Sequence, residues 1–205
     1  MKIFSNSKTT SNPPLRKLKL LSVASICLLT TAISFAHDGD MNPSEEAVSI
    51  LSEGNLTKVE LLLNGGININ DDLIGDGTPL IIAVQNNKKK LVEYLLGQGA
   101  DINQKSVQDG SPLIVASLTN NIELVEYLHK QGASIDAVTE YDETALISAS
   151  RAGNFQIVKF LVEQGADINL AVEAKTLKGS ELRSPLNGAK TIAIRDYLIA
   201  NGARS

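Results

Sequence analysis

The stretch from Gly77 to Asn103, GTPLIIAVQNNKKKLVEYLLGQGADIN, decides the fold of this chain. It has two short apolar segments joined by a polar turn, and its closing segment, Gly99–Asn103, recurs every 33 residues. The glycines that begin the closing segments are Gly66, Gly99, Gly132 and Gly165. Such a period predicts a repeat array, in which each unit buries its apolar face only by stacking on its neighbours.

The opening of the unit keeps the same 33-residue step. Its copies are TPLI at 78–81, SPLI at 111–114 and TALI at 144–147. Thr78 can cap a helix, and Pro79 suits the first turn because the N–H that proline lacks has no partner there. Nine residues after each opening comes a residue that tolerates positive φ: Asn87, Asn120 or Gly153. The pattern therefore predicts units of two short helices joined by a tight turn.

A unit that opens with T-P-L, has V-x-x-L-L in its second helix and ends in G-A-D-x-N resembles the ankyrin repeat. The second-helix segments here are VEYLL at 92–96, VEYLH at 125–129 and VKFLV at 158–162. The resemblance implies an all-α fold, an ankyrin-repeat solenoid of stacked helix-turn-helix units with short hairpin-like finger loops. One departure stands at Ile81, Ile114 and Ile147, where the motif usually has histidine, and there we expect apolar packing.

The resemblance covers about residues 44–203 and divides a domain at 44–205 into five units. Their expected bounds are 44–70, 71–103, 104–136, 137–169 and 170–203, after a flexible segment at 37–43. The last unit is irregular, because Ser184 lies 40 residues after Thr144 and not 33. We therefore expect a seven-residue insertion in a long, mobile finger over 170–183, followed by a shortened cap.

The first 36 residues have the pattern of a secretory signal peptide. Five basic residues and no acidic one lie there, and the apolar run from Leu20 to Phe35 ends at Ala36, where small residues suit cleavage. An uncleaved anchor would need about 20 apolar residues, and lipid attachment at Cys27 would need a small residue in place of Ile26. We expect cleavage after Ala36 and a bacterial periplasmic location, since the remaining chain has no cysteine.

Charge narrows the class of partner. The whole chain carries a net charge of −4, and without the five basic leader residues 14 Lys and Arg would face 23 Asp and Glu, or about −9. This balance argues against nucleic acid and against an anionic membrane surface. It is compatible with a basic protein partner. We expect a chain that is monomeric on its own and not inserted in the membrane after cleavage.

The residues that could carry catalysis do not converge in the sequence. After the leader only His37 and His129 remain, and no nucleotide-binding, zinc or redox motif occurs. The carboxylates of Asp101, Asp136 and Asp167 are expected to form hydrogen bonds within their own turns. We therefore expect no enzyme activity, no catalytic residues, no cofactor and no metal.

In the ankyrin family, partners usually bind the concave side, which the finger loops and first helices form. Carried over position by position, the resemblance gives these candidate partner-binding residues: Ile74, Gln85, Asn86, Val107, Gln108, Leu118, Thr119, Glu140, Tyr141, Arg151 and Ala152. The expected function is a non-catalytic protein-binding scaffold, such as an inhibitor or an immunity protein against an effector aimed at the envelope. The alternative is an accessory factor that supports a periplasmic enzyme such as a catalase.

Overall fold

The computed structural model describes residues 43–73, 75–106, 110–138, 143–176 and 179–204. The elements within these ranges are α2 (Pro43–Glu53), α3 (Leu56–Asn64), α4 (Pro79–Gln85), α5 (Lys89–Gly97), α6 (Pro112–Leu118), α7 (Ile122–Lys130), α8 (Ala145–Ala152), α9 (Phe155–Glu163), β1 (Val172–Thr176), β2 (Gly179–Arg183) and α10 (Ile192–Ala200). The predicted leader lies outside the described residues, as does the segment 37–42. Pro43, expected in the flexible segment, instead begins α2. None of the helices described is long and apolar enough to span a membrane.

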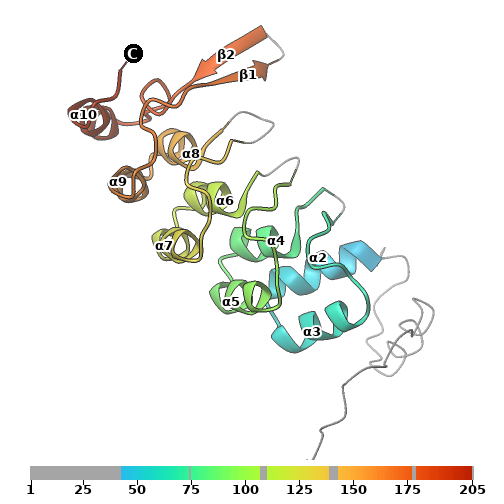
Figure 1. Ribbon diagram of the computed structural model, residues 1–205. Helices are drawn as coiled ribbons and strands as arrows, with labels where there is room; N and C mark the ends of the chain where they lie inside the picture. The colour runs from blue at the N-terminus through green and yellow to red at the C-terminus, as the bar shows by residue number, and fades with distance from the viewer. Residues whose placement is uncertain (1–42, 74, 107–109, 139–142, 177–178, 205) are drawn as a thin grey trace, which may run out of the picture. The chain divides into compact units, whose positions relative to one another are not determined.

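The helices pair within units, and the units stack. In Figure 1, α2, α4, α6 and α8 follow one another in one row, while α3, α5, α7, α9 and α10 form a second row. The six residues Pro79–Val84 of α4 are all buried, as are the six residues Pro112–Ser117 of α6. Helices of seven residues are too short to be stable alone, so burial against neighbouring units supplies their stability. The predicted solenoid of helix pairs is confirmed.

Local chemistry fixes where each first helix begins. The hydroxyl oxygens of Thr78, Ser111 and Thr144 accept hydrogen bonds from backbone N–H groups three residues later, at donor–acceptor distances of 3.3, 3.4 and 3.2 Å. The bond from each cap reaches the isoleucine at the usual histidine position. All three isoleucines are buried, as expected for Ile81, Ile114 and Ile147.

The turn inside each pair also follows the predicted chemistry. Asn87 and Asn120 have φ of 55° and 56°, and Gly153 has φ of 90°. Asn121 Nδ2 donates to Asn87 Oδ1 at 2.9 Å, so one turn is held by the next unit. Residues that accept a left-handed backbone therefore stand where the chain reverses.

A row of side-chain-to-backbone hydrogen bonds joins consecutive units. Asn70 Oδ1 accepts from the backbone N–H of Asp101 at 2.8 Å, and Asn103 Oδ1 accepts from that of Ser134 at 2.9 Å. In the next two units, Asp136 Oδ1 accepts from the backbone N–H of Asp167 at 3.0 Å, and Asn169 Oδ1 accepts from that of Arg204 at 2.8 Å. The first three bonds span 31 residues and the last spans 35. The last bond therefore spans four more residues than the others, which equals the seven residues inserted in the last unit less three that are missing from its shortened cap.

The prediction for the aspartates is correct at two positions and wrong at one. Asp101 and Asp167 each accept a bond from a backbone N–H two residues on, inside their own turns. Asp136 instead accepts the bond from the next unit. The reason is register, since Asp136 is the counterpart of Asn103 and not of Asp101.

The last unit differs from the prediction. The expected long, mobile finger is an antiparallel hairpin in which β1 and β2 pair from Val172↔Arg183 to Thr176↔Gly179. Val172 and Ala174 are buried while Glu173 between them is exposed, so β1 has one face packed on the protein, whereas residues 179–182 of β2 are exposed. Residues 185–188 form a turn in place of a first helix, and α10 follows.

The second helix of this unit closes the stack on α9. Ile194 and Leu198 are buried, and the Tyr197 ring meets Phe155 edge to face with centroids 5.5 Å apart. Burial raises the pKa of Tyr197, and the nearby carboxylate of Glu163 adds to the rise. Arg195 is exposed at the position where earlier units bury valine, at Val92, Val125 and Val158. A charged residue at this position suits a terminal repeat.

Candidate functional site

The predicted partner-binding residues include a row at the ends of the first helices. Gln85, Leu118 and Arg151 occupy equivalent positions 33 residues apart, on the last turns of α4, α6 and α8. We call the surface made by these three residues the finger face. Leu118 is 47% exposed, although the six preceding residues of α6 are all buried. Much of the Leu118 side chain therefore does not pack between units.

The neighbouring row is engaged within the protein. Asn86 Nδ2 donates to the backbone oxygen of Ile82 at 2.9 Å and to Ser52 Oγ at 3.3 Å. Thr119 Oγ1 donates to the backbone oxygen of Ala116 at 3.2 Å. The backbone oxygen of Ala152 accepts from Lys190 Nζ at 3.1 Å. Asn86, Thr119 and Ala152 therefore take part in hydrogen bonds within the protein, which the sequence does not reveal.

The remaining predicted residues belong to the fingers. Ile74, Val107, Gln108, Glu140 and Tyr141 lie outside the described residues. The described part of the second finger is held at its base, where Ser106 and Gly110 exchange backbone hydrogen bonds of 3.0 and 3.2 Å. Asp72 in the preceding loop accepts a bond from Ser106 Oγ at 3.0 Å.

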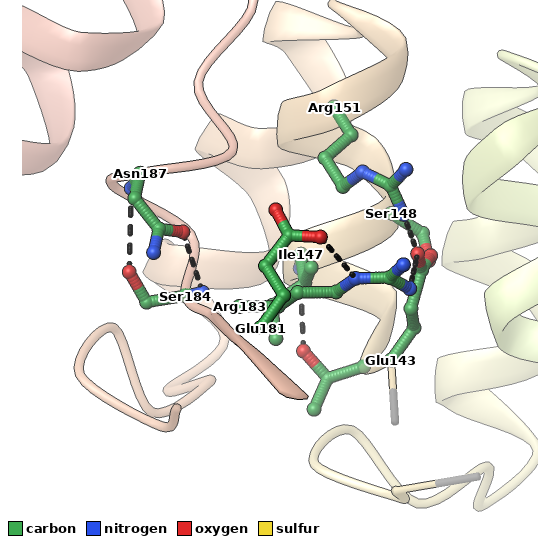
Figure 2. Close-up of polar contacts among 9 residues, drawn as sticks. Glu143, Ile147, Ser148, Arg151, Glu181, Arg183, Ser184 and Asn187 are labelled. Carbon is green, nitrogen blue, oxygen red and sulfur yellow. Dashed lines mark hydrogen bonds and ion pairs between the residues drawn. The ribbon is translucent and has the colours of Figure 1, made fainter. Parts of the chain in front are cut away.

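At the hairpin end of the finger face, a carboxylate joins two arginines. Glu143 Oε1 accepts a hydrogen bond from Arg183 Nη1 at 3.0 Å and forms an ion pair with Arg151 Nη1. Its other oxygen, Oε2, accepts from Ser148 Oγ at 2.7 Å. Figure 2 shows the two guanidinium groups reaching this carboxylate, one from α8 and one from β2. Glu143 thereby ties the base of the hairpin to the fourth unit.

A hollow of about 300 Å³ lies beside this cluster. We call it the basic hollow, and its lining residues are Arg151, Glu181, Arg183, Asn187, Gly188 and Lys190. A Cβ added at Gly188 would come within 2.8 Å of Arg151 Cγ, so glycine allows the turn to pass close to the arginine stem. The turn itself is fixed by Asn187, whose Oδ1 accepts from the backbone N–H of Ser184 at 2.7 Å.

The sequence prediction found Arg151 but missed its surroundings. Glu143 stands where the second and third units have Gly77 and Gly110, and that break in the pattern was the available signal. Arg183 lies 40 residues away in the sequence, in a segment expected to be a loop. No periodic feature joins these two residues, so their pairing is visible only in three dimensions.

Within the described residues, no cluster of three or more His, Cys, Asp or Glu side chains is arranged to hold a metal ion. His129 Nδ1 is buried and makes no hydrogen bond to a described residue, and its ring meets Phe160 edge to face at 5.8 Å. The ring of His129 on α7 therefore packs against Phe160 on α9.

The fold and this surface define a helical repeat protein with a polar and partly apolar face on its first helices. The family model described as ankyrin repeats (3 copies) matches residues 32–106 and 105–171, which together are more than half of the 205-residue chain. The chain belongs to the ankyrin-repeat family, whose domains are typically non-catalytic modules that bind other proteins. No curated protein matches the chain. The family match ends before β1, so the hairpin and α10 lie beyond it.

Proposed function

We propose that the finger face is where this protein holds its protein partner, and that binding, without catalysis, is its function. The observation that carries the proposal is the exposure of Leu118 at the end of an otherwise buried helix. A large apolar side chain left in water costs free energy that a partner's surface would recover on binding. Arg151 in the same row is 45% exposed, and arginine is common among residues that dominate binding energy.

We further propose that the protein acts in the bacterial periplasm after removal of residues 1–36, as an inhibitor or an immunity protein. The basic segment, the apolar run and the small residues near Ala36 support export. The rigid stack of capped helix pairs supports a preformed surface, which lowers the ordering cost of binding. N-terminal sequencing of the exported protein should give His37, and an intact Met1 would refute the cleavage.

The partner should be isolated with the protein from a periplasmic extract, identified, and then titrated in purified form by calorimetry. Leu118→Asp places a charge on the finger face and should weaken binding by about 2 kcal/mol or more, roughly thirtyfold. The matched control is Leu61→Asp on α3, because Leu61 is also exposed, at 57%, but lies in the other row of helices. Equal affinity of both variants and the unaltered chain would refute the finger-face assignment.

The identity of the partner separates the two roles. A toxin or a hydrolase whose activity falls on binding would support inhibition. An oxidoreductase such as a catalase, unaffected or stabilised by binding, would support the accessory role and refute inhibition.

A further inference from the structure

We propose that the basic hollow receives an acidic side chain, glutamate or aspartate, from the protein partner. This inference rests on the proposed function, because it names the chemistry of one contact on the finger face. It extends that face from Arg151 to the hairpin, which lies outside the family match.

The local balance of charge favours an anionic occupant of the hollow. Arg151, Arg183 and Lys190 bring three positive charges to the lining of the hollow and Glu181 brings one negative charge, while Glu143 lies beside the hollow and adds a second negative charge. The carboxylate of Glu143 is shared by both arginines. Glu181 is a weak partner, since its Oε2 lies 3.9 Å from Arg183 Nε and its side chain is 64% exposed. Among the described residues, one positive charge of the hollow is therefore left without an opposite charge.

Two of the cations that line the hollow, Arg151 and Lys190, have hydrogen-bond donors available for a ligand. A guanidinium has five N–H donors and an ammonium has three. Among the described residues, Lys190 Nζ donates to the backbone oxygen of Ala152 at 3.1 Å and forms no ion pair. Arg151 is 45% exposed, so part of its guanidinium faces solvent. A carboxylate entering between these two cations would accept charge-assisted hydrogen bonds from both.

The size of the hollow fits one side chain. Gly188 has no side chain, and Lys190 lies along the backbone of the preceding unit, with its Cδ 3.0 Å from where a Cβ on Gly153 would be. The hollow of about 300 Å³ is at the lower end of the range for sites that enclose a small molecule, roughly 300–1,000 Å³. It suits one side chain with its water better than it suits a cofactor.

The charge count also favours a carboxylate over a phosphate. A phosphate brings up to two negative charges and would lie close to Glu143 and Glu181, whereas one carboxylate matches the single excess positive charge. The net negative charge of the chain does not oppose such a contact, because salt screens exposed charges beyond about 8 Å in physiological buffer. The cations of the hollow therefore bind the acidic side chain only at short range, after the rest of the interface has brought the partner into place.

The direct test uses an N-acetylated hexaglutamate peptide as the probe, titrated into the purified full chain in low-salt buffer. Hexaglutamate should bind, and it should shift the side-chain NMR signals of Arg151 and Lys190. Lys190→Gln should weaken binding about tenfold, the order expected for one charge-assisted hydrogen bond. The matched control is Lys159→Gln, which removes the same charge from α9, where Lys159 pairs with Glu163 at 3.7 Å.

Three results would overturn the proposal. The first is hexaglutamate that does not bind or that leaves both signals unmoved. The second is an equal loss in Lys190→Gln and Lys159→Gln, which would indicate general charge attraction. The third is inorganic phosphate that binds more tightly than hexaglutamate, which would make the hollow a phosphate site.

The isolated partner separates this proposal from the finger-face function. Loss of binding in Leu118→Asp with full binding in Lys190→Gln would leave the finger face in place and refute the acidic contact. Full binding in both would refute both. If Leu118→Asp and Lys190→Gln both lose partner binding, a charge swap should restore it: Lys190→Glu should bind a partner variant in which the contacting acidic residue is changed to lysine. If no acidic position of the partner restores binding in this way, the acidic contact is refuted.

Discussion

Replacing Glu143 with alanine should release the hairpin from the fourth unit. The change removes a carboxylate that is only 15% exposed and that contacts Arg151, Arg183 and the hydroxyl of Ser148. Breaking a fully buried ion pair by deleting one partner costs about 3–5 kcal/mol. Here Arg183 is 21% exposed and Arg151 is 45% exposed, so water can solvate the freed guanidinium groups and offset part of this cost. We expect the free energy that holds the hairpin closed to fall by about 2 kcal/mol.

Amide hydrogen exchange is the assay that resolves this local opening. A loss of about 2 kcal/mol should speed exchange of the hydrogen-bonded amides in β1 and β2 about thirtyfold, while amides of α4 and α5 keep their rates. The matched control is Glu181→Ala, which removes a 64% exposed carboxylate from the same hairpin and should change the rates little. Glu143→Gln should fall between, because its amide oxygen can still accept a hydrogen bond but carries no charge.

An equal effect of Glu143→Ala and Glu181→Ala on hairpin exchange would refute a specific role of Glu143. Opening of the whole array in Glu143→Ala would also refute it, because the carboxylate would then support global stability and not the hairpin alone. A double-mutant cycle with Arg183→Ala isolates the pair, and its coupling energy should exceed about 0.5 kcal/mol.

Two further predictions concern turns and pH. Gly99→Ala should cost about 1–2 kcal/mol from backbone strain alone, since φ is 92° and no atom lies within 4 Å of the added Cβ. Gly153→Ala should cost more in urea unfolding, because its Cβ also meets Lys190 Cδ at 3.0 Å, and a smaller cost there would contradict the contact. Because burial raises the pKa of Tyr197, the unfolded chain ionises this phenol first, so stability should fall as pH rises past about 10. Tyr197→Phe should remove that part of the fall in pH-dependent melts, and an unchanged profile would refute the assignment.

The repeat units could be predicted because their signals are local. Thr78 with Pro79, the left-handed Asn87 and the closing Gly99 each set a backbone conformation within a few residues. Their recurrence at one period makes a chance match improbable. The row of half-buried Gln85 and exposed Leu118 and Arg151 followed from the same alignment, because equivalent positions in stacked units face the same way.

The insertion in the last unit could be predicted, but the hairpin that it forms could not, because that structure depends on contacts distant in sequence. The alternation of buried Val172 and Ala174 with exposed Glu173 is a strand signal, but it covers few residues and resembles an ordinary loop insertion. Pairing of Glu143 with Arg183 spans 40 residues and has no counterpart in the other units. The basic hollow is built from these contacts and so lay beyond the reach of the repeat pattern.

The row of bonds from Asn70, Asn103, Asp136 and Asn169 has a mechanical consequence. Each bond crosses one boundary, so a chain pulled from its ends should yield boundary by boundary and not all at once. Each regular unit that detaches would add 33 residues of slack, or about 11–12 nm at 3.3–3.6 Å per residue. The bonded amides of Asp167 and Arg204 are 37 residues apart, four more than those of Ser134 and Asp167, so breaking the last bond would lengthen the tether by about 12–13 nm, a single longer step in a force trace.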